Sequence, residues 1–184
     1  MRTHTSGIRI LLLFAGPATP AAAMVGWACA YPRSTPLGAA CQKVARKHYG
    51  DTLVEFHNNI HSLTLRDIKH LAGKRGFDQI ICTSPCAPFS ALGKRDGFNV
   101  DSVAMDSQKS LTIMRWALDI NQRCICVLEN VRMTPGQLLQ ASALVADVLP
   151  CMQALQAART GPTRRFRYFF TNVAFAPARL PADP

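Results

Sequence analysis

Short apolar runs alternate along the chain with longer segments in which apolar residues recur at helical spacing. A compact apolar run bounded by Gly, Pro or charged residues is typical of a buried strand, whereas apolar residues three or four positions apart indicate a helix covering a sheet. Strands are therefore predicted at 8–14, 53–56, 78–83, 124–128 and 167–173. Helices are predicted at 19–25, 39–48, 63–72, 107–121 and 136–149. The alternation predicts an α/β fold with a mostly parallel sheet and helices on both faces.

The length and apolar content of the chain predict one domain. Its 184 residues are 48% hydrophobic, which suffices for one sizeable core. We expect this domain to span residues 1–175, because residues 176–184 form a tail rich in Pro and Ala.

The charge balance favours a polyanionic partner. Lys and Arg number 21 against 11 Asp and Glu, which gives a formal net charge of +10. Neutralising phosphates releases counterions whichever nucleic-acid sequence is bound, so this surplus favours nucleic acid. Net charge alone does not separate DNA from RNA or from an anionic membrane.

The cysteines and histidines predict a reduced, cytoplasmic protein without a metal centre. The seven cysteines are odd in number and lack the paired spacing of a zinc ribbon. The five histidines are scattered among polar residues, and none lies at a ligand-like spacing from a cysteine pair.

The N-terminal segment has two interpretations. Its early arginines, the apolar run at 8–15 and the small residues that follow resemble a secretory signal, which would place the mature N-terminus near Ala30. The run is also short and broken by Gly16, which fits a strand followed by a turn. No stretch of the sequence is long and apolar enough to be expected to cross a membrane.

The strongest chemical signal is the ordered pair of segments TSPCAPFS at 83–90 and VLENV at 127–131. Each is expected where a strand ends, which is where ligands bind parallel sheets. Cys86 lies on a loop stiffened by Pro85, and a thiolate there could act as a nucleophile. Glu129 could donate a proton or hydrogen bond to whatever Cys86 attacks. Taken alone, the cysteine is better explained as a buried structural residue, and the glutamate as a cap or a solvated residue.

A third segment, TRRFRYFFTN at 163–172, carries two arginines on one face of a predicted strand. Arg165 and Arg167 could together contact a phosphate, a carboxylate or a base edge. A basic edge strand that resists aggregation explains the same pattern equally well.

In this order, the segments resemble the cytosine carbon-5 DNA methyltransferases over residues 9–173. LLLFAGPAT resembles the family's Phe-x-Gly-x-Gly motif, SPCAPFS its Pro-Cys loop, LENV its Glu-Asn-Val motif and TRRFRYFFTN its Gln-x-Arg-x-Arg motif. The resemblance implies a Rossmann-like fold, S-adenosylmethionine as the cofactor and DNA as the partner, with a tRNA-methylating branch as an alternative.

The resemblance also assigns roles to residues. The catalytic positions are Cys86, Glu129, Arg165 and Arg167. The cofactor-binding positions are Phe14, Ala15, Gly16, Asn59, Ser84 and Pro85. The substrate-binding positions are Ser90, Asn130 and Val131. By this analogy a flipped cytosine is attacked at carbon-6 by the cysteine and steadied at nitrogen-3 by the glutamate, while Asn130 braces the loop.

Several positions depart from the family pattern. Ala18 replaces the second Gly of the first motif, Ala87 follows the Pro-Cys pair, and Thr163 begins the arginine motif. Asn59 corresponds to an Asp near the adenine, and no acidic residue is found for the cofactor ribose. The resemblance does not extend to a target-recognition region, which a partner chain could supply. Two hypotheses follow: a minimal, phage-like enzyme with weak sequence specificity, or a catalytically inactive module that binds nucleic acid or regulates a partner.

Overall fold

The computed structural model describes residues 8–14, 27–30, 43–44, 47, 54–57, 59–84, 86, 89, 96–99, 101–156 and 166–174. Its strands are β1 (Ile10–Leu13), β2 (Trp27–Ala30), β3 (Val54–His57), β4 (Gln79–Thr83), β5 (Ile125–Val131), β6 (Cys151–Gln156) and β7 (Phe166–Thr171). Its helices are α2 (Leu65–Ala72), α3 (Asp101–Ile120) and α4 (Pro135–Val145), with short 3-10 helices η2 (Ile60–Ser62) and η4 (Gly97–Asn99).

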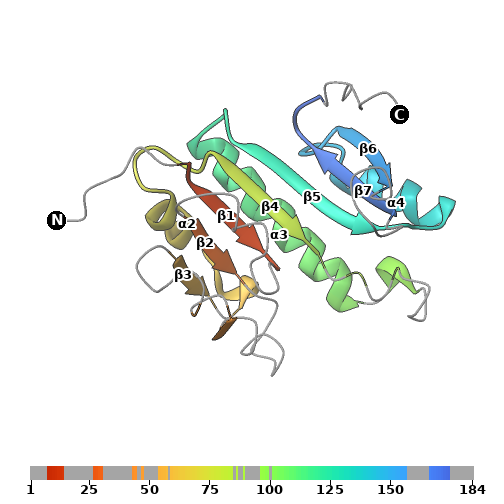
Figure 1. The fold of residues 1–184 in the computed structure, drawn as a ribbon, viewed down its shortest axis with the longest axis horizontal. Helices are drawn as coiled ribbons and strands as arrows, with labels where there is room; N and C mark the ends of the chain where they lie inside the picture. Colours follow the sequence, from red (N-terminus) through yellow and green to blue (C-terminus); the bar gives the residue numbers. More distant parts are fainter. Residues whose placement is uncertain are drawn as a thin grey trace, which may run out of the picture.

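The seven strands of the described ranges form one mixed sheet in the order β3-β2-β1-β4-β5-β7-β6 (Figure 1). The first five strands in this order are parallel. β7 runs antiparallel to both β5 and β6. Helix α3 provides the long crossover that the parallel pair β4 and β5 needs. The carboxyl ends of β1, β4 and β5 therefore meet at one edge of the sheet.

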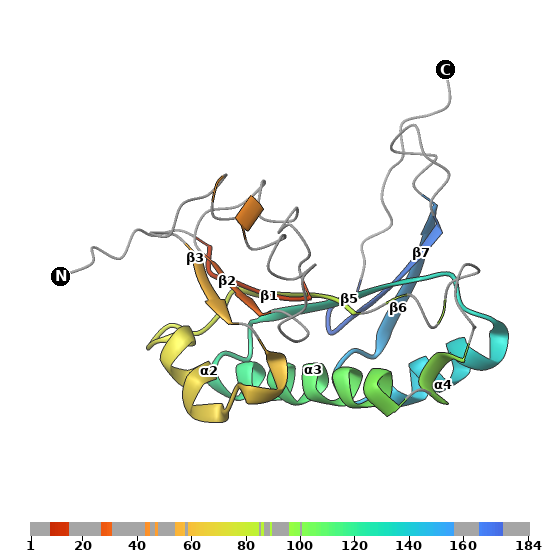
Figure 2. The ribbon, with the colours of Figure 1, turned by 90° about the horizontal axis from the view of Figure 1, so that it is seen from below.

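The helices α2, α3 and α4 lie on one face of the sheet (Figure 2). Alternate side chains of β5 point to that face, so Cys126, Leu128 and Asn130 are buried, whereas the intervening Val127 and Glu129 are half-buried on the other face. The helices predicted at 19–25 and 39–48 lie outside the described residues, except for helical positions 43, 44 and 47.

The main core fills the space between the sheet and these helices. Leu11 and Leu13 of β1 are fully buried, as are Ile113 and Met114 of α3. Burying each such side chain contributes about 1.5–3 kcal/mol to folding. None of the helices in the described part of the chain is long and apolar enough to cross a bilayer.

The helix boundaries have local causes. α2 begins in a capping box, in which Thr64 and Asp67 satisfy each other's backbone N–H groups, and it ends before Gly73 at φ +58°. α4 begins in a second capping box between Thr134 and Gln137, with Pro135 in its first turn.

The sequence pattern predicted most of these elements, although the last predicted helix ran to residue 149 whereas α4 ends at Val145, and three further differences appear. The predicted strands are confirmed as β1, β3, β4, β5 and β7, and the last three predicted helices as α2, α3 and α4. The prediction missed β2 and β6, and it started α3 at residue 107 instead of 101. It was also wrong about the end of β5, because Glu129 and Asn130 lie inside this strand, which continues to Val131 in order to pair with β7.

Candidate active site

The carboxyl ends of β1 and β4 are tied together by a side chain. Thr83 Oγ1 donates a hydrogen bond of 2.7 Å to the carbonyl oxygen of Phe14, the residue that follows β1. Phe14 is buried and has φ +58°, and it is the one non-glycine residue in the described ranges with a positive φ. This conformation costs about 1–3 kcal/mol for a bulky residue and is concentrated at functional sites.

Cys86 lies three residues beyond the end of β4, and its side chain is exposed. The carbonyl of Cys86 accepts a 3.0 Å hydrogen bond from the N–H of Phe89, whose buried ring meets Phe98 edge-on at 4.9 Å. The loop is therefore anchored in the core immediately after the cysteine, while the thiol remains accessible.

The other four cysteines whose side-chain exposure the structure describes have different surroundings. Cys82, Cys124 and Cys126 are buried, and Cys151 is half-buried. Burial raises the pKa of the Cys82 thiol to about 12, and a hydrogen bond with Cys124 together with burial raises the pKa of Cys126. A thiol with a raised pKa is a poor nucleophile at neutral pH. Accessibility therefore singles out Cys86 among the five.

Asn130 holds the beginning of the same loop. Its Nδ2 donates a 2.9 Å hydrogen bond to Ser84 Oγ, and both residues are buried. Its Oδ1 accepts a 2.8 Å hydrogen bond from the N–H of Val131, so both ends of the amide are engaged. A cavity of about 10 Å³ beside this pair is also lined by Leu128 and Met133, and it holds at most one water. This cavity is therefore too small for a nucleobase.

Glu129 and Arg167 form an ion pair on the opposite face of the sheet. Glu129 Oε1 lies 2.5 Å from Arg167 Nε, and the two side chains are 22% and 18% exposed. The register explains the contact, because Arg167 lies opposite Val131 and so sits diagonally across from Glu129. Arg167 Nη1 also donates to the carbonyl of Phe166 at 2.7 Å. The carboxylate and the guanidinium are thus held together and partly exposed.

The backbone positions that carry Cys86 and Glu129 are close to each other. Glu129 is the register partner of Thr83 on adjacent strands, which are about 4.8 Å apart. Cys86 follows Thr83 by three residues, which span at most about 11 Å. The thiol and the carboxylate therefore come from neighbouring strands with no other strand between them.

The remaining predicted site residues divide into two groups. Asn59 caps η2, and its Oδ1 accepts a 2.9 Å hydrogen bond from the N–H of His61. Val131 ends β5 and is half-buried. Outside the described residues lie Ala15, Gly16, Pro85, Ser90 and Arg165.

Sequence reasoning missed several contacts at this edge. Thr83 stands out in the sequence only as part of a motif, although its hydroxyl joins two strands. His61 Nε2 lies 2.6 Å from Asp106 Oδ1. Lys109 Nζ donates a hydrogen bond of 2.6 Å to the carbonyl of Leu63. Two side chains of α3 therefore contact the segment that contains η2. These partners are far apart in sequence, and no spacing pattern signals them.

Comparisons with known proteins extend this description. No family model and no curated protein matches the chain. Among solved structures, it is similar to a protein from E. coli assigned as a DNA modification methyltransferase encoded within a prophage, with TM-score 0.57, 20% identity, and coverage of 89% of this chain and 46% of that one. It is also similar to the Entamoeba histolytica methyltransferase EhMeth, with TM-score 0.59, 14% identity, and coverage of 91% and 53%.

A third similar structure is Streptococcus pneumoniae Sp1610, assigned as a tRNA (m1A22) methyltransferase, with TM-score 0.50, 8% identity, and coverage of 92% and 64%. The chain spans about half the length of the first two structures. The chain has the α/β, Rossmann-like fold of S-adenosylmethionine-dependent methyltransferases.

Proposed function

We propose that this chain is a DNA (cytosine-5-)-methyltransferase that uses S-adenosylmethionine and the thiol of Cys86. The observation that carries the proposal is the exposed Cys86 at the carboxyl end of β4, next to the strand that presents Glu129 paired with Arg167. A nucleophile, a carboxylate and a cation from neighbouring strands are the groups that attack on a pyrimidine ring requires.

Each of these residues has a separate chemical role in the reaction of a flipped cytosine. The thiolate of Cys86 forms a bond to carbon-6, and the ring electrons move to make carbon-5 nucleophilic. Glu129, as the acid, gives its proton to nitrogen-3 when the sulfur adds and takes it back when the carbon–sulfur bond breaks, and Arg167 at 2.5 Å stabilises the carboxylate formed in between. After carbon-5 has gained a methyl group, its proton leaves to a base. The carbon–sulfur bond then breaks, which releases Cys86 as a thiolate and restores the ring.

Two contacts would keep the nucleophile in place. The Asn130 amide fixes Ser84 two residues before Cys86, and the Phe89 N–H fixes the carbonyl of Cys86 itself. Misplacing a nucleophile by about 1 Å costs on the order of a hundredfold in rate. Asn130 and Phe89 therefore act as positioning residues in this proposal.

S-adenosylmethionine would bind at the edge where ligands bind such sheets. The positive φ of Phe14 turns the chain sharply after β1, and Asn59 begins η2 two residues after β3. Phe14 would pack against the cofactor, and Asn59 would face its adenine. When bound there, S-adenosylmethionine supplies an electrophilic methyl group to the activated carbon-5.

The direct test is transfer of label from methyl-labelled S-adenosylmethionine to a DNA duplex. We expect transfer by the natural chain, none by Cys86→Ser and unchanged transfer by Cys151→Ser, a half-buried cysteine in β6 that serves as the matched control. Absence of transfer at saturating cofactor, or transfer by Cys86→Ser, would disprove the proposal. A parallel assay with tRNA distinguishes a DNA substrate from an RNA substrate. Transfer to tRNA alone would also disprove the proposal.

An inactive nucleic-acid-binding module is the second candidate, and one observation favours it. Asn59 carries an amide and no carboxylate, and its Oδ1 already accepts a hydrogen bond from the N–H of His61. Calorimetry discriminates the two functions. DNA binding without measurable cofactor binding would support the inactive module, whereas micromolar cofactor affinity would exclude it.

A further inference from the structure

One face of α2 is strongly basic. Arg66, Lys69 and His70 lie three and four positions apart on this helix, and Lys74 follows in the turn after it, all with exposed side chains. We call these four residues the α2 basic surface. The opposite side of the helix is apolar and packs towards the core through Ile68, Leu71 and Ala72.

Two acidic residues, Asp67 and Asp78, lie near this surface in the sequence. Asp67 is engaged in the capping box with Thr64. Asp78 accepts hydrogen bonds from Arg75 at 3.0 and 3.1 Å and from the N–H of Arg9 at 2.7 Å. No ion pair joins Arg66, Lys69 or Lys74 to an acidic residue within the described ranges. The surface therefore presents a positive field to the solvent.

The helix dipole explains only part of this pattern. Cations in the last turn are favourable, which accounts for Lys69 and His70. The carbonyl of Leu71 near the helix end already accepts a hydrogen bond from Arg9 Nη2. Arg66 lies in the first turn, where a positive charge is unfavourable, and Lys74 lies beyond the helix. These two cations need another explanation.

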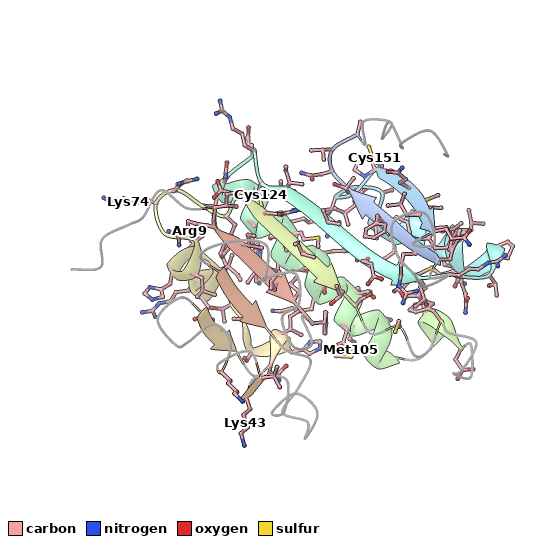
Figure 3. The ribbon with its side chains drawn as sticks, viewed as in Figure 1. Arg9, Lys43, Lys74, Met105, Cys124 and Cys151 are labelled. Atoms are coloured by element: carbon pink, nitrogen blue, oxygen red, sulfur yellow. The ribbon has the colours of Figure 1, made fainter. Side chains whose placement is uncertain are left out.

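Lys74, the last residue of the α2 basic surface, is remote from Cys86. Figure 3 shows Lys74 and Arg9 at the edge where β1 and β4 begin, whereas Cys86 follows the far end of β4. The five residues of β4 span roughly 15 Å. That separation exceeds the Debye length of about 8 Å at physiological salt, so the two regions would contact different phosphates.

We propose that the α2 basic surface binds the phosphodiester backbone of nucleic acid, at phosphates other than those next to the target base. Charge complementarity and the net charge of +10 support this occupant. The contact is independent of base sequence. The choice of nucleic acid as the polyanion rests on the proposed function.

The test measures how the affinity for a duplex of about 24 base pairs depends on salt, by fluorescence anisotropy. Arg66→Gln, Lys69→Gln and Lys74→Gln are each expected to lower the slope of log affinity against log salt by about 0.9, which is about eightfold in affinity at 0.1 M salt. Arg66→Lys should retain the slope. The matched control is Arg115→Gln on α3, because this exposed arginine is paired with Asp147 at 3.4 Å.

Unchanged slopes in all three variants would overturn the proposal, and so would an equal loss in Arg115→Gln, which would mean that only total charge matters. Binding to phosphatidylserine vesicles that requires these residues while duplex binding does not would assign the surface to membranes instead. The result is separable from the proposed function: Cys86→Ser should lose methyl transfer and keep the slope, whereas the α2 variants should change the slope even if no methyl transfer occurs.

Discussion

The side chain of Asn130 donates a 2.9 Å hydrogen bond to Ser84 Oγ, in a buried position two residues before the exposed Cys86. The contact joins β5 to the loop that follows β4, so the strand carrying Glu129 also fixes the loop carrying the thiol. The mobility of the nucleophile is therefore coupled to the packing of β5.

Ser84→Ala should destabilise the protein by about 1–3 kcal/mol, because it leaves the buried Nδ2 of Asn130 without its acceptor. Urea unfolding measures this loss. Thr112→Ala on α3 is the control, because the Thr112 hydroxyl donates to a backbone carbonyl at an exposed position. This substitution should change the free energy of unfolding by less than about 0.5 kcal/mol. Equal stability of the two variants would mean that the buried contact does not hold the loop.

The ion pair between Glu129 and Arg167 should be energetically coupled. In a double-mutant cycle with Glu129→Gln and Arg167→Gln, we expect a coupling of about 0.5–3 kcal/mol, because both side chains are largely shielded from water. The comparison cycle is Arg115 with Asp147, which are 49% and 84% exposed at 3.4 Å and should couple by less than about 0.5 kcal/mol. No difference between the two cycles would argue against an oriented carboxylate.

The described cysteines should react with iodoacetamide in the order of their exposure. Cys86 is expected to be alkylated first, Cys151 more slowly, and Cys82, Cys124 and Cys126 only when the protein unfolds. Peptide mass spectrometry over time follows each residue separately. Alkylation of Cys82 before Cys86 in the folded protein would contradict the exposure of the thiol.

Stability should fall at alkaline pH because of Cys82. Burial raises the pKa of this thiol from 9.0 to about 12, so between these values the unfolded chain loses a proton that the folded chain keeps. The contribution of the buried, neutral thiol to the free energy of unfolding is complete below pH 9. It decreases by about 1.4 kcal/mol per pH unit up to pH 12. The test measures the free energy of unfolding of the natural chain and of Cys82→Ala from pH 8 to 11. If both proteins lose stability equally as the pH rises, the prediction is wrong.

The elements that the sequence predicted are those whose burial leaves a pattern. β4 reads QIICT and β5 reads ICVLENV, and alternate side chains of each are buried. β6 reads CMQALQ and is an edge strand exposed along most of its length, so it has no apolar stripe to recognise. β2 reads WACA, in which small residues with low strand propensity dominate.

The sequence predicted residues for the candidate site but not the contacts between them. The order of the motifs along the chain was enough to indicate Cys86, Glu129 and Arg167. The ion pair, however, depends on the antiparallel register of β5 with β7, and the Asn130–Ser84 bond depends on β5 lying beside β4. Registers are set by long-range packing, which a single sequence does not reveal.

The central claim is a covalent bond between Cys86 and carbon-6 of a target cytosine. A duplex in which 5-fluorocytosine replaces cytosine tests it most directly, because fluorine at carbon-5 cannot leave as the proton does and the adduct persists. With S-adenosylmethionine present, intact-mass measurement should show protein joined to methylated DNA, and peptide mapping should place the bond on Cys86, with no adduct in Cys86→Ser. A protein that binds cofactor and duplex without forming the adduct, or that forms it through another residue, would contradict this account.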